Sequence, residues 1–169
     1  FQTVLLLLKH SFPPEERRTP AGQADLLSRP AYRLTVRREK DGKITGFFAW
    51  WQFDSFRYGE HFAVDEAMRG GGIGGEMMHM LTAADEPFVL EVEPPETEIA
   101  RRRIRFYERG GFVVNPFEYL QPPLHPGRRP LPLLFLSRPA PLSEDEFVRM
   151  RTEIYRTVYG LSNPETAFR

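Results

Sequence analysis

The 169-residue sequence contains no cysteine, which excludes disulfide bonds, thiolate metal sites and a cysteine nucleophile. It also lacks an excess of either charge, because 23 basic and 23 acidic residues balance to zero. Nucleic-acid-binding domains usually carry a basic excess, so we expect no nucleic-acid partner. The four histidines, His10, His61, His79 and His125, are scattered along the chain. None of them lies four residues from another, so no metal site is predicted.

Long hydrophobic runs are absent as well. The apolar stretch from Val4 to Leu8 is followed at once by Lys9 and His10, whereas a membrane-spanning helix needs about 20 apolar residues. A secretory signal would need basic residues before this stretch and a small-residue cleavage site after it, and neither is present. We therefore expect a cytoplasmic protein with no membrane partner.

The pattern of apolar residues, turn signals and caps indicates a mixed α/β fold. The predicted helices cover residues 1–11, 22–28, 72–84, 97–109 and 143–159. The predicted strands cover residues 31–38, 44–53, 58–64, 88–92, 112–114 and 131–137. The first three strands form an antiparallel meander, and a proline-rich segment joins the last two. In helix 72–84 we expect four side chains to face the sheet: Met77, Met78, Met80 and Leu81.

A glycine-rich segment follows the third strand and opens the next helix. Five of its six positions are glycine, with Ile73 as the exception: Gly70, Gly71, Gly72, Gly74 and Gly75. Missing side chains let a ligand touch the backbone, and unpaired amides at a helix N-terminus favour a pyrophosphate. Arg69 adds a positive charge at the entrance. A flexible turn without a ligand is the plainer interpretation, and the segment by itself leaves it open.

Two nucleotide-binding patterns compete for these glycines. A Walker loop needs Lys followed by Ser or Thr at the helix start, and Glu76 stands there instead. The dinucleotide fingerprint is satisfied by Gly70, Gly72 and Gly75, and Glu91 lies about where an acidic ribose partner is expected. Five residues nevertheless separate the strand from the first glycine, and an antiparallel meander precedes it. A nicotinamide-dinucleotide-binding oxidoreductase is therefore disfavoured, although it stays an alternative.

The run from Arg69 to Gly74 resembles the Arg/Gln-x-x-Gly-x-Gly/Ala pattern of the GNAT acetyltransferases. The element order also resembles the GNAT fold, a largely antiparallel twisted sheet of about six to seven strands with helices on both faces. An extra C-terminal helix is expected, and a first strand is expected to precede Phe1. The resemblance implies one domain: N-terminal helices and acceptor-side loop (1–30), cofactor-binding core (31–115), and C-terminal strand and helix (116–169).

The resemblance also implies acetyl-coenzyme A as the acetyl donor. In the family the Arg-Gly turn, here residues 69–75, holds the coenzyme pyrophosphate. The backbone of the preceding strand receives the pantetheine arm, which assigns that role to Phe62, Ala63 and Val64. Many family members carry an asparagine where Ala100 stands, and Arg103 is the candidate to replace its contact through the phosphates.

A helical tyrosine, Tyr107, precedes Gly110-Gly111-Phe112 in a second pattern that resembles the family. A phenol can protonate the departing coenzyme A thiolate, so Tyr107 is the predicted general acid. A helical tyrosine of this kind is otherwise most often part of the core. The attacking amine needs a base, for which Glu60 is predicted, with Glu91 second and His61 third. Strand alternation predicts that Glu60 shares a face with Tyr58, Phe62 and Val64.

The acceptor is the least defined part of the prediction. Glu16 and Arg17 belong to a charged loop that either clamps a polar substrate or is an exposed linker. Trp51 and Glu93 are further candidates for substrate contact. The sequence thus predicts direct acetyl transfer to a primary amine of a small molecule or peptide, by a monomer or homodimer. A catalytically inactive domain that senses coenzyme A is the alternative from the binding class.

Overall fold

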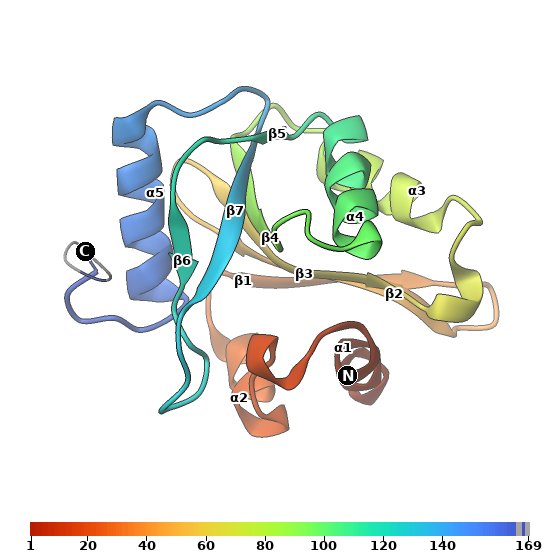
Figure 1. The fold of residues 1–169 in the computed structure, drawn as a ribbon. Helices are drawn as coiled ribbons and strands as arrows, with labels where there is room; N and C mark the ends of the chain where they lie inside the picture. Colours follow the sequence, from red (N-terminus) through yellow and green to blue (C-terminus); the bar gives the residue numbers. More distant parts are fainter. Residues whose placement is uncertain (165–166, 168–169) are drawn as a thin grey trace. The chain divides into compact units, whose positions relative to one another are not determined.

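The computed structural model describes residues 1–164 and 167, which fall into two compact units, Phe1–Glu86 and Pro87–Arg169. These residues form seven strands and five α helices (Figure 1). The prediction of a mixed α/β fold is confirmed. Among the described residues, no helix combines the length and the apolar character that a bilayer requires. The same residues contain no group of three His, Asp or Glu side chains that could hold a metal ion.

The first unit is an antiparallel meander with a helix packed on each face. Its strands are β1 (Tyr32–Arg38), β2 (Ile44–Gln52) and β3 (Arg57–Val64), paired in chain order. Its helices are α1 (Gln2–Ser11), α2 (Pro20–Asp25) and α3 (Ile73–Leu81), with 3-10 turns η1 (Pro14–Glu16), η2 (Leu26–Ser28) and η3 (Glu66–Met68). Thr19 begins α2 by accepting a hydrogen bond from the Gly22 amide, and Pro20 fits the first helical position.

Glycine at position 46 allows α3 to lie close to the meander. A Cβ atom there would come within 2.9 Å of Met77 Sδ on α3 and 3.2 Å of the Ala63 carbonyl. The face of β2 that carries Gly46 and Phe48 therefore faces α3. The other face of β2 carries Phe47 and Trp51, which are almost fully buried.

A β-bulge interrupts the pairing of β2 with β3. Ala49 pairs with His61 whereas Trp50 pairs with Gly59, so Glu60 is the extra residue on β3. Glu60 and His61 both turn toward the N-terminal segment, where they contact Arg18 and Phe12 respectively. Phe62 instead contacts Phe48 on the α3 face, with ring centroids 5.5 Å apart. The prediction that Glu60 shares a face with Phe62 and Val64 is therefore wrong, because the bulge breaks the alternation.

The second unit is built around β7 (Leu131–Arg138), which pairs antiparallel with three strands. These strands are β4 (Phe88–Val92), β5 (Val113–Val114) and β6 (Tyr119–Gln121). Helix α4 (Glu98–Arg109) begins at Thr97, whose side chain accepts from the Ala100 amide, and ends at Gly110. Helix α5 (Glu144–Thr157) begins with a complete capping box between Ser143 and Glu146, as the sequence predicts.

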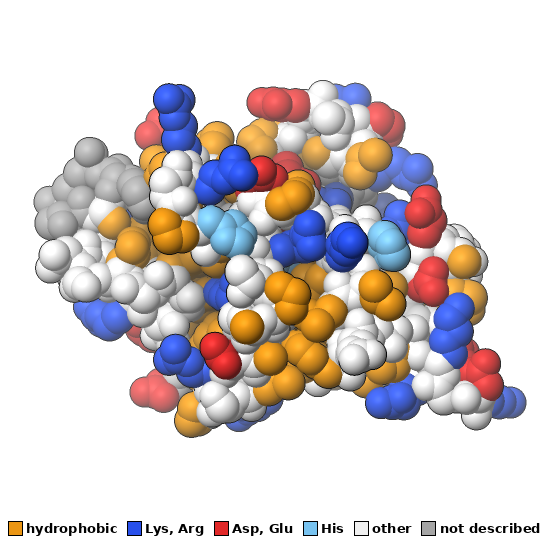
Figure 2. Space-filling model, turned by 90° about the horizontal axis from the view of Figure 1, so that it is seen from below, with side chains coloured by type: hydrophobic (Ala, Val, Ile, Leu, Met, Phe, Trp, Pro, Cys, Tyr) orange, Lys and Arg blue, Asp and Glu red, His pale blue; other side chains and the backbone are white. Residues whose placement is uncertain are grey.

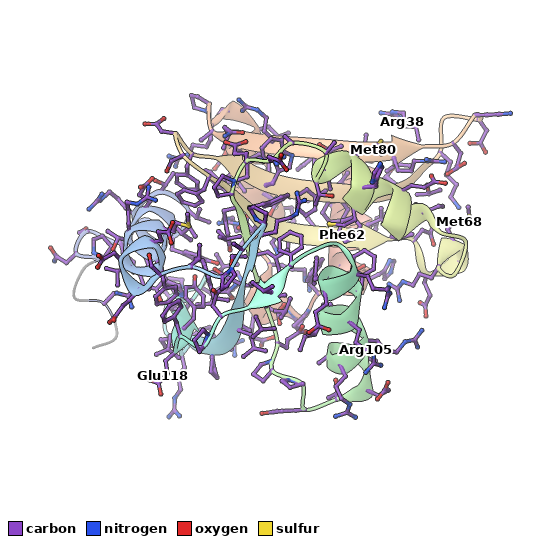
Figure 3. The ribbon with its side chains drawn as sticks, turned by 90° about the horizontal axis from the view of Figure 1, so that it is seen from above. Arg38, Phe62, Met68, Met80, Arg105 and Glu118 are labelled. Atoms are coloured by element: carbon purple, nitrogen blue, oxygen red, sulfur yellow. The ribbon has the colours of Figure 1, made fainter. Side chains whose placement is uncertain are left out.

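Four expectations about the helices and strands are wrong. Helix α3 ends at Leu81 rather than at residue 84, and Met80 is 59% exposed instead of facing the sheet (Figure 3). Strand β6 lies inside the proline-rich segment, where no strand is predicted. The second helix begins at Pro20 and finishes as the 3-10 turn η2.

Candidate active site

The glycine-rich turn forms the N-terminus of α3. Gly72 is the N-cap residue and, like Gly70, has a φ of 84°, which L-residues with side chains rarely adopt. The first four amides of a helix have no partner inside it, and here they belong to residues 72–75. A Cβ atom added at Gly70, Gly72 or Gly75 would meet nothing within 4 Å. The turn therefore borders open space at these glycines, and the helix N-terminus supplies amides without an intrahelical partner, as a pyrophosphate cradle requires.

Two acidic side chains near this turn, those of Asp65 and Glu76, each form an ion pair with a basic residue. Asp65 is ion-paired with Lys43 at 3.4 Å, and Glu76 is ion-paired with Arg37 at 2.8 Å. Arg69 is exposed, and its Nε donates to the Val64 carbonyl at 3.2 Å. The arginine thus links the end of β3 to the turn. Met68, in the η3 turn just before it, is labelled in Figure 3.

Glu60 lies in a nearly closed polar cluster on the face of the meander that α1 and α2 cover. Its carboxylate forms an ion pair with Arg18 and accepts a hydrogen bond from Trp51 Nε1 at 3.0 Å. The Glu60 side chain is only 3% exposed. Burial alone would raise the pKa of Glu60, but the Arg18 charge and these hydrogen bonds outweigh it and lower the pKa. Trp51, a predicted substrate contact, is itself buried and positions this carboxylate.

His61, the neighbour of Glu60, is also buried. Its Nε2 lies 2.7 Å from the Glu16 carbonyl oxygen, and its ring packs edge-on against Phe12. Nδ1 is buried and has no hydrogen-bond partner within residues 1–164 and 167. Burial lowers the pKa of His61, against the opposing charge of Glu60. Glu16 therefore reaches the cluster through its backbone, while Arg17 is tied to the Pro13 carbonyl at 3.3 Å.

In the second unit, Tyr107 is buried on α4 between the rings of Phe106 and Phe112. Its hydroxyl has no hydrogen-bond partner in the part of the chain that the structure describes. Burial raises the pKa of Tyr107 to about 12, with the Arg103 charge acting against it and the Glu93 charge adding to it. Arg103 and Glu93 form an ion pair with each other. Part of the Arg103 guanidinium is therefore engaged with Glu93.

Glu91 is the centre of a hydrogen-bonded cluster that the sequence does not reveal. Its carboxylate accepts from the Tyr119 hydroxyl, from Gln121 Nε2 at 2.8 Å and from the Tyr159 hydroxyl at 3.2 Å. Burial raises the pKa of Tyr119 well above its usual value. These partners lie 28 to 68 residues from Glu91 in the chain, so no local motif could identify them. Arg18, the partner of Glu60, follows Arg17 in the charged loop but is not among the predicted site residues.

Residues 31–114 match the family described as the acetyltransferase (GNAT) domain. Over 107 residues the chain is 32% identical to "Putative acetyltransferase YjbC" of Bacillus subtilis strain 168, covering 62% of this chain and 54% of that protein. It therefore spans about half the length of this curated relative.

Two solved structures have a similar fold. A protein from Bacteroides thetaiotaomicron assigned to the GNAT acetyltransferases is 35% identical, with a TM-score of 0.87 over 95% of this chain and 92% of that one. A GNAT family acetyltransferase from Elizabethkingia anophelis with acetyl-CoA bound is 13% identical. Its TM-score is 0.52 over 70% of this chain and 82% of that one, a likeness in fold alone.

Proposed function

Because the chain belongs to the GNAT acetyltransferase family, we propose that it moves an acetyl group from acetyl-coenzyme A to a primary amine. The acceptor is proposed to be a small molecule or a peptide. The observation that carries this proposal is the glycine turn at the start of α3, where Gly70, Gly72 and Gly75 border open space and the first four amides have no partner within the helix. The two units are proposed to act as a single catalytic domain with the cofactor-binding core at residues 31–115.

The coenzyme would bind with its pyrophosphate on the amides of residues 70–75, with Arg69 adding a positive charge. Its pantetheine arm would follow the backbone from Val64 toward Phe62, because the glycine turn follows this end of β3 after residues 65–69. The thioester then lies at the Phe62 end of the arm, next to the bulge. The relative from Elizabethkingia anophelis, which has acetyl-CoA bound, supports the choice of cofactor.

Acetyl transfer needs no covalent enzyme intermediate in this proposal. The amine nitrogen bonds to the acetyl carbon, the carbon–sulfur bond breaks, and the electron pair stays on sulfur. The Tyr107 hydroxyl is proposed to donate to that sulfur. Glu60 or Glu91 as the base stays a prediction, and their contacts weigh against it. Each carboxylate already accepts from two or three donors, which stabilises the anion and weakens it as a base.

Thermal unfolding with three ligands tests the cofactor. Acetyl-coenzyme A and coenzyme A should each raise the melting temperature, because a ligand at a hundred times its Kd stabilises by about 2.7 kcal/mol. NAD should leave the melting temperature unchanged. Stabilisation by NAD alone would overturn the proposal in favour of the dinucleotide alternative.

A panel of amines then separates an enzyme from a coenzyme A sensor. Released coenzyme A can be followed with a thiol reagent, and the protein adds no background because it contains no cysteine. We expect thiol release that depends on both acetyl-coenzyme A and an amine. Binding of acetyl-coenzyme A without release for any amine would favour the sensor.

A further inference from the structure

The bulge in β3 brings a basic nitrogen next to the proposed thioester position, and the reaction described so far does not use it. We propose that His61 Nδ1 is the base that takes the proton from the acceptor amine. This inference rests on the proposed function. It changes the order of the predicted bases, in which His61 stood behind Glu60 and Glu91.

The hydrogen bond of His61 fixes which of its nitrogens can accept a proton. A backbone carbonyl can only accept, so Nε2, which lies 2.7 Å from the Glu16 oxygen, must carry the hydrogen. In a neutral imidazole the other nitrogen then has a lone pair and no hydrogen. The edge-on contact with Phe12 helps to hold the ring in this orientation. Nδ1 is therefore a fixed acceptor.

His61 Nδ1 has no hydrogen-bond donor in the described part of the chain. Nδ1 is buried and without a partner among the described residues, although buried polar atoms are nearly always hydrogen-bonded. Leaving such an atom unsatisfied is unfavourable, because it has lost its hydrogen bonds to water. An N–H group of a bound amine would satisfy it. By contrast, the Glu60 oxygens are already bonded to Arg18 and Trp51.

The bulge places this group where the reaction is proposed to occur. Because Glu60 is the extra residue, its side chain and that of His61 lie on the same face, and Phe62 follows directly. The pantetheine arm is proposed to end at Phe62. An amine that attacks the thioester there would have His61 as an adjacent residue of the strand. Without the bulge, successive side chains would alternate, and Glu60 and His61 would lie on opposite faces.

The proton transfer balances without another reactant. An ammonium group gives one proton to Nδ1, and the resulting amine attacks the acetyl carbon. As the carbon–sulfur bond breaks, the nitrogen loses a second proton, which ends on the sulfur of the released coenzyme A. The imidazolium keeps its Nε2 hydrogen bond to Glu16 and is stabilised by the negative charge of Glu60. The ionisable groups that act on His61 are Glu60 and Arg18, whose charges oppose each other. The proton passes to water when the product leaves.

The tautomer can be tested without knowing the acceptor. Nitrogen-15 NMR of the full chain resolves protonated from unprotonated imidazole nitrogens, and the His61→Gln variant assigns the signal among four histidines. At pH 7 we expect a neutral ring with hydrogen on Nε2, which becomes protonated only below the usual histidine pKa of 6.5. Hydrogen on Nδ1, or an imidazolium at pH 7, would overturn the inference.

The catalytic role is tested by a pH profile with the most active amine of the panel. Glutamine can still donate to the Glu16 carbonyl but is not a base, so His61→Gln should remain folded and bind acetyl-coenzyme A within twofold of wild type. Its kcat should fall about 10²- to 10⁴-fold, the usual contribution of a general base. The wild-type decline in activity at acidic pH, which follows protonation of His61, should be absent from this variant. The matched control is His79→Gln, an exposed histidine of α3, which should keep the wild-type rate and profile.

The failed outcomes can be told apart. A His61→Gln enzyme with wild-type turnover, or with the acidic decline intact, overturns the role of His61 and leaves acetyl transfer standing. A wild-type protein that binds acetyl-coenzyme A but acetylates no amine overturns both proposals.

Discussion

The Tyr107 ring is packed among hydrophobic side chains while its hydroxyl has no partner in the described part of the chain. The pKa of about 12 means that the phenol is neutral throughout the physiological range. A thiol has a pKa of about 8.5, so full proton transfer from Tyr107 to the sulfur is uphill by about 5 kcal/mol. The structure thus favours a hydrogen bond from Tyr107 to the developing thiolate over complete transfer.

Removing the Tyr107 hydroxyl should slow the reaction without weakening the binding of coenzyme A. We expect Tyr107→Phe to lower kcat by about 10- to 150-fold, because a hydrogen bond to a charged group contributes about 1.5–3 kcal/mol. The Kd for coenzyme A, measured by calorimetry, should change less than twofold. The wild-type rate should show no titration of Tyr107 below about pH 11. An unchanged kcat would exclude the donor role.

The ion pair of Arg18 and Glu60 should contribute strongly to stability, because both side chains are largely buried. Breaking a buried pair leaves an uncompensated charge and typically costs about 3–5 kcal/mol. We expect Arg18→Met to lower the free energy of unfolding by about that amount, measured in denaturant. The matched control is Arg101→Met, which removes an exposed pair with Glu98 and should cost no more than about 1 kcal/mol. Equal effects of the two variants would contradict this account.

At the scale of single residues, the sequence predicts the chemistry of a position better than its partners. Glu60 is on the predicted strand, and the helical position of Tyr107 is correct. The partners of Glu60 and Glu91 come from distant segments, and only folding brings them together. The face of Glu60 was wrong because strand alternation assumes a regular strand, and a bulge gives no clear signal in the composition of β3.

The first turn of helix α3 is the proposed pyrophosphate site, and two of its glycine positions separate backbone strain from helix stability. Gly72→Ala places a side chain at a φ of 84° and should cost about 1–2 kcal/mol in the free energy of unfolding. Gly75→Ala lies inside the helix and should stabilise it by up to about 1 kcal/mol. Both free energies can be measured in denaturant.

The Gly72→Ala variant also tests where the coenzyme binds. A Cβ atom at Gly72 would have open space around it, so it would occupy part of the space at the turn that is proposed to hold the pyrophosphate. We expect Gly72→Ala to raise the Kd for coenzyme A at least tenfold, measured by calorimetry. A Gly72→Ala protein with wild-type affinity would show that the pyrophosphate does not bind there.

At the scale of elements, boundaries follow local chemistry where a cap is present. Thr97 and the Ser143 capping box mark the starts of α4 and α5 correctly. Strand β6 was missed because prolines surround it and its three residues pair with β7 through the fold. Met80 was misplaced because α3 has only a narrow buried stripe, formed by Ile73, Met77, Met78 and Leu81.

For the whole molecule, stability should depend on pH in a direction fixed by the buried ionisable groups. His61 and Glu60 both have a pKa below the usual 6.5 and 4.5, so the unfolded chain binds more protons than the native one below these values. Their contribution to stability is complete above about pH 6.5. It decreases as the pH falls toward the lowered pKa of each group.

We therefore expect the free energy of unfolding to decline from about pH 6.5 downward, by at most about 1.4 kcal/mol per pH unit for each group. Denaturant titrations between pH 4 and pH 8 measure this slope. His61→Gln should flatten the upper part of the decline, and His79→Gln should not. A stability that stays constant from pH 7 to pH 5 would contradict the burial of a neutral His61.

Some hydrophobic side chains of the N-terminal helices remain exposed on the surface of the molecule. Leu6 of α1 and Leu27 of η2 are 55% and 51% exposed, and hydrophobic side chains are visible on the face drawn in Figure 2. The sequence predicts these helices, but it does not predict which of their leucines remain outside the core.

The bulge at Glu60 also affects how this protein can be aligned and how its gene can change. If a related protein lacks the extra residue, the alignment gap belongs opposite position 60, because a gap elsewhere in β3 would pair side chains from opposite faces. Loss of the single Glu60 codon would leave the reading frame intact. The residues on both sides of the deletion would also keep their faces, because Gly59 and His61 would stay opposite Trp50 and Ala49. The shortest genetic lesion at this position therefore removes the bulge and the partner of Arg18 without changing the register of the strand.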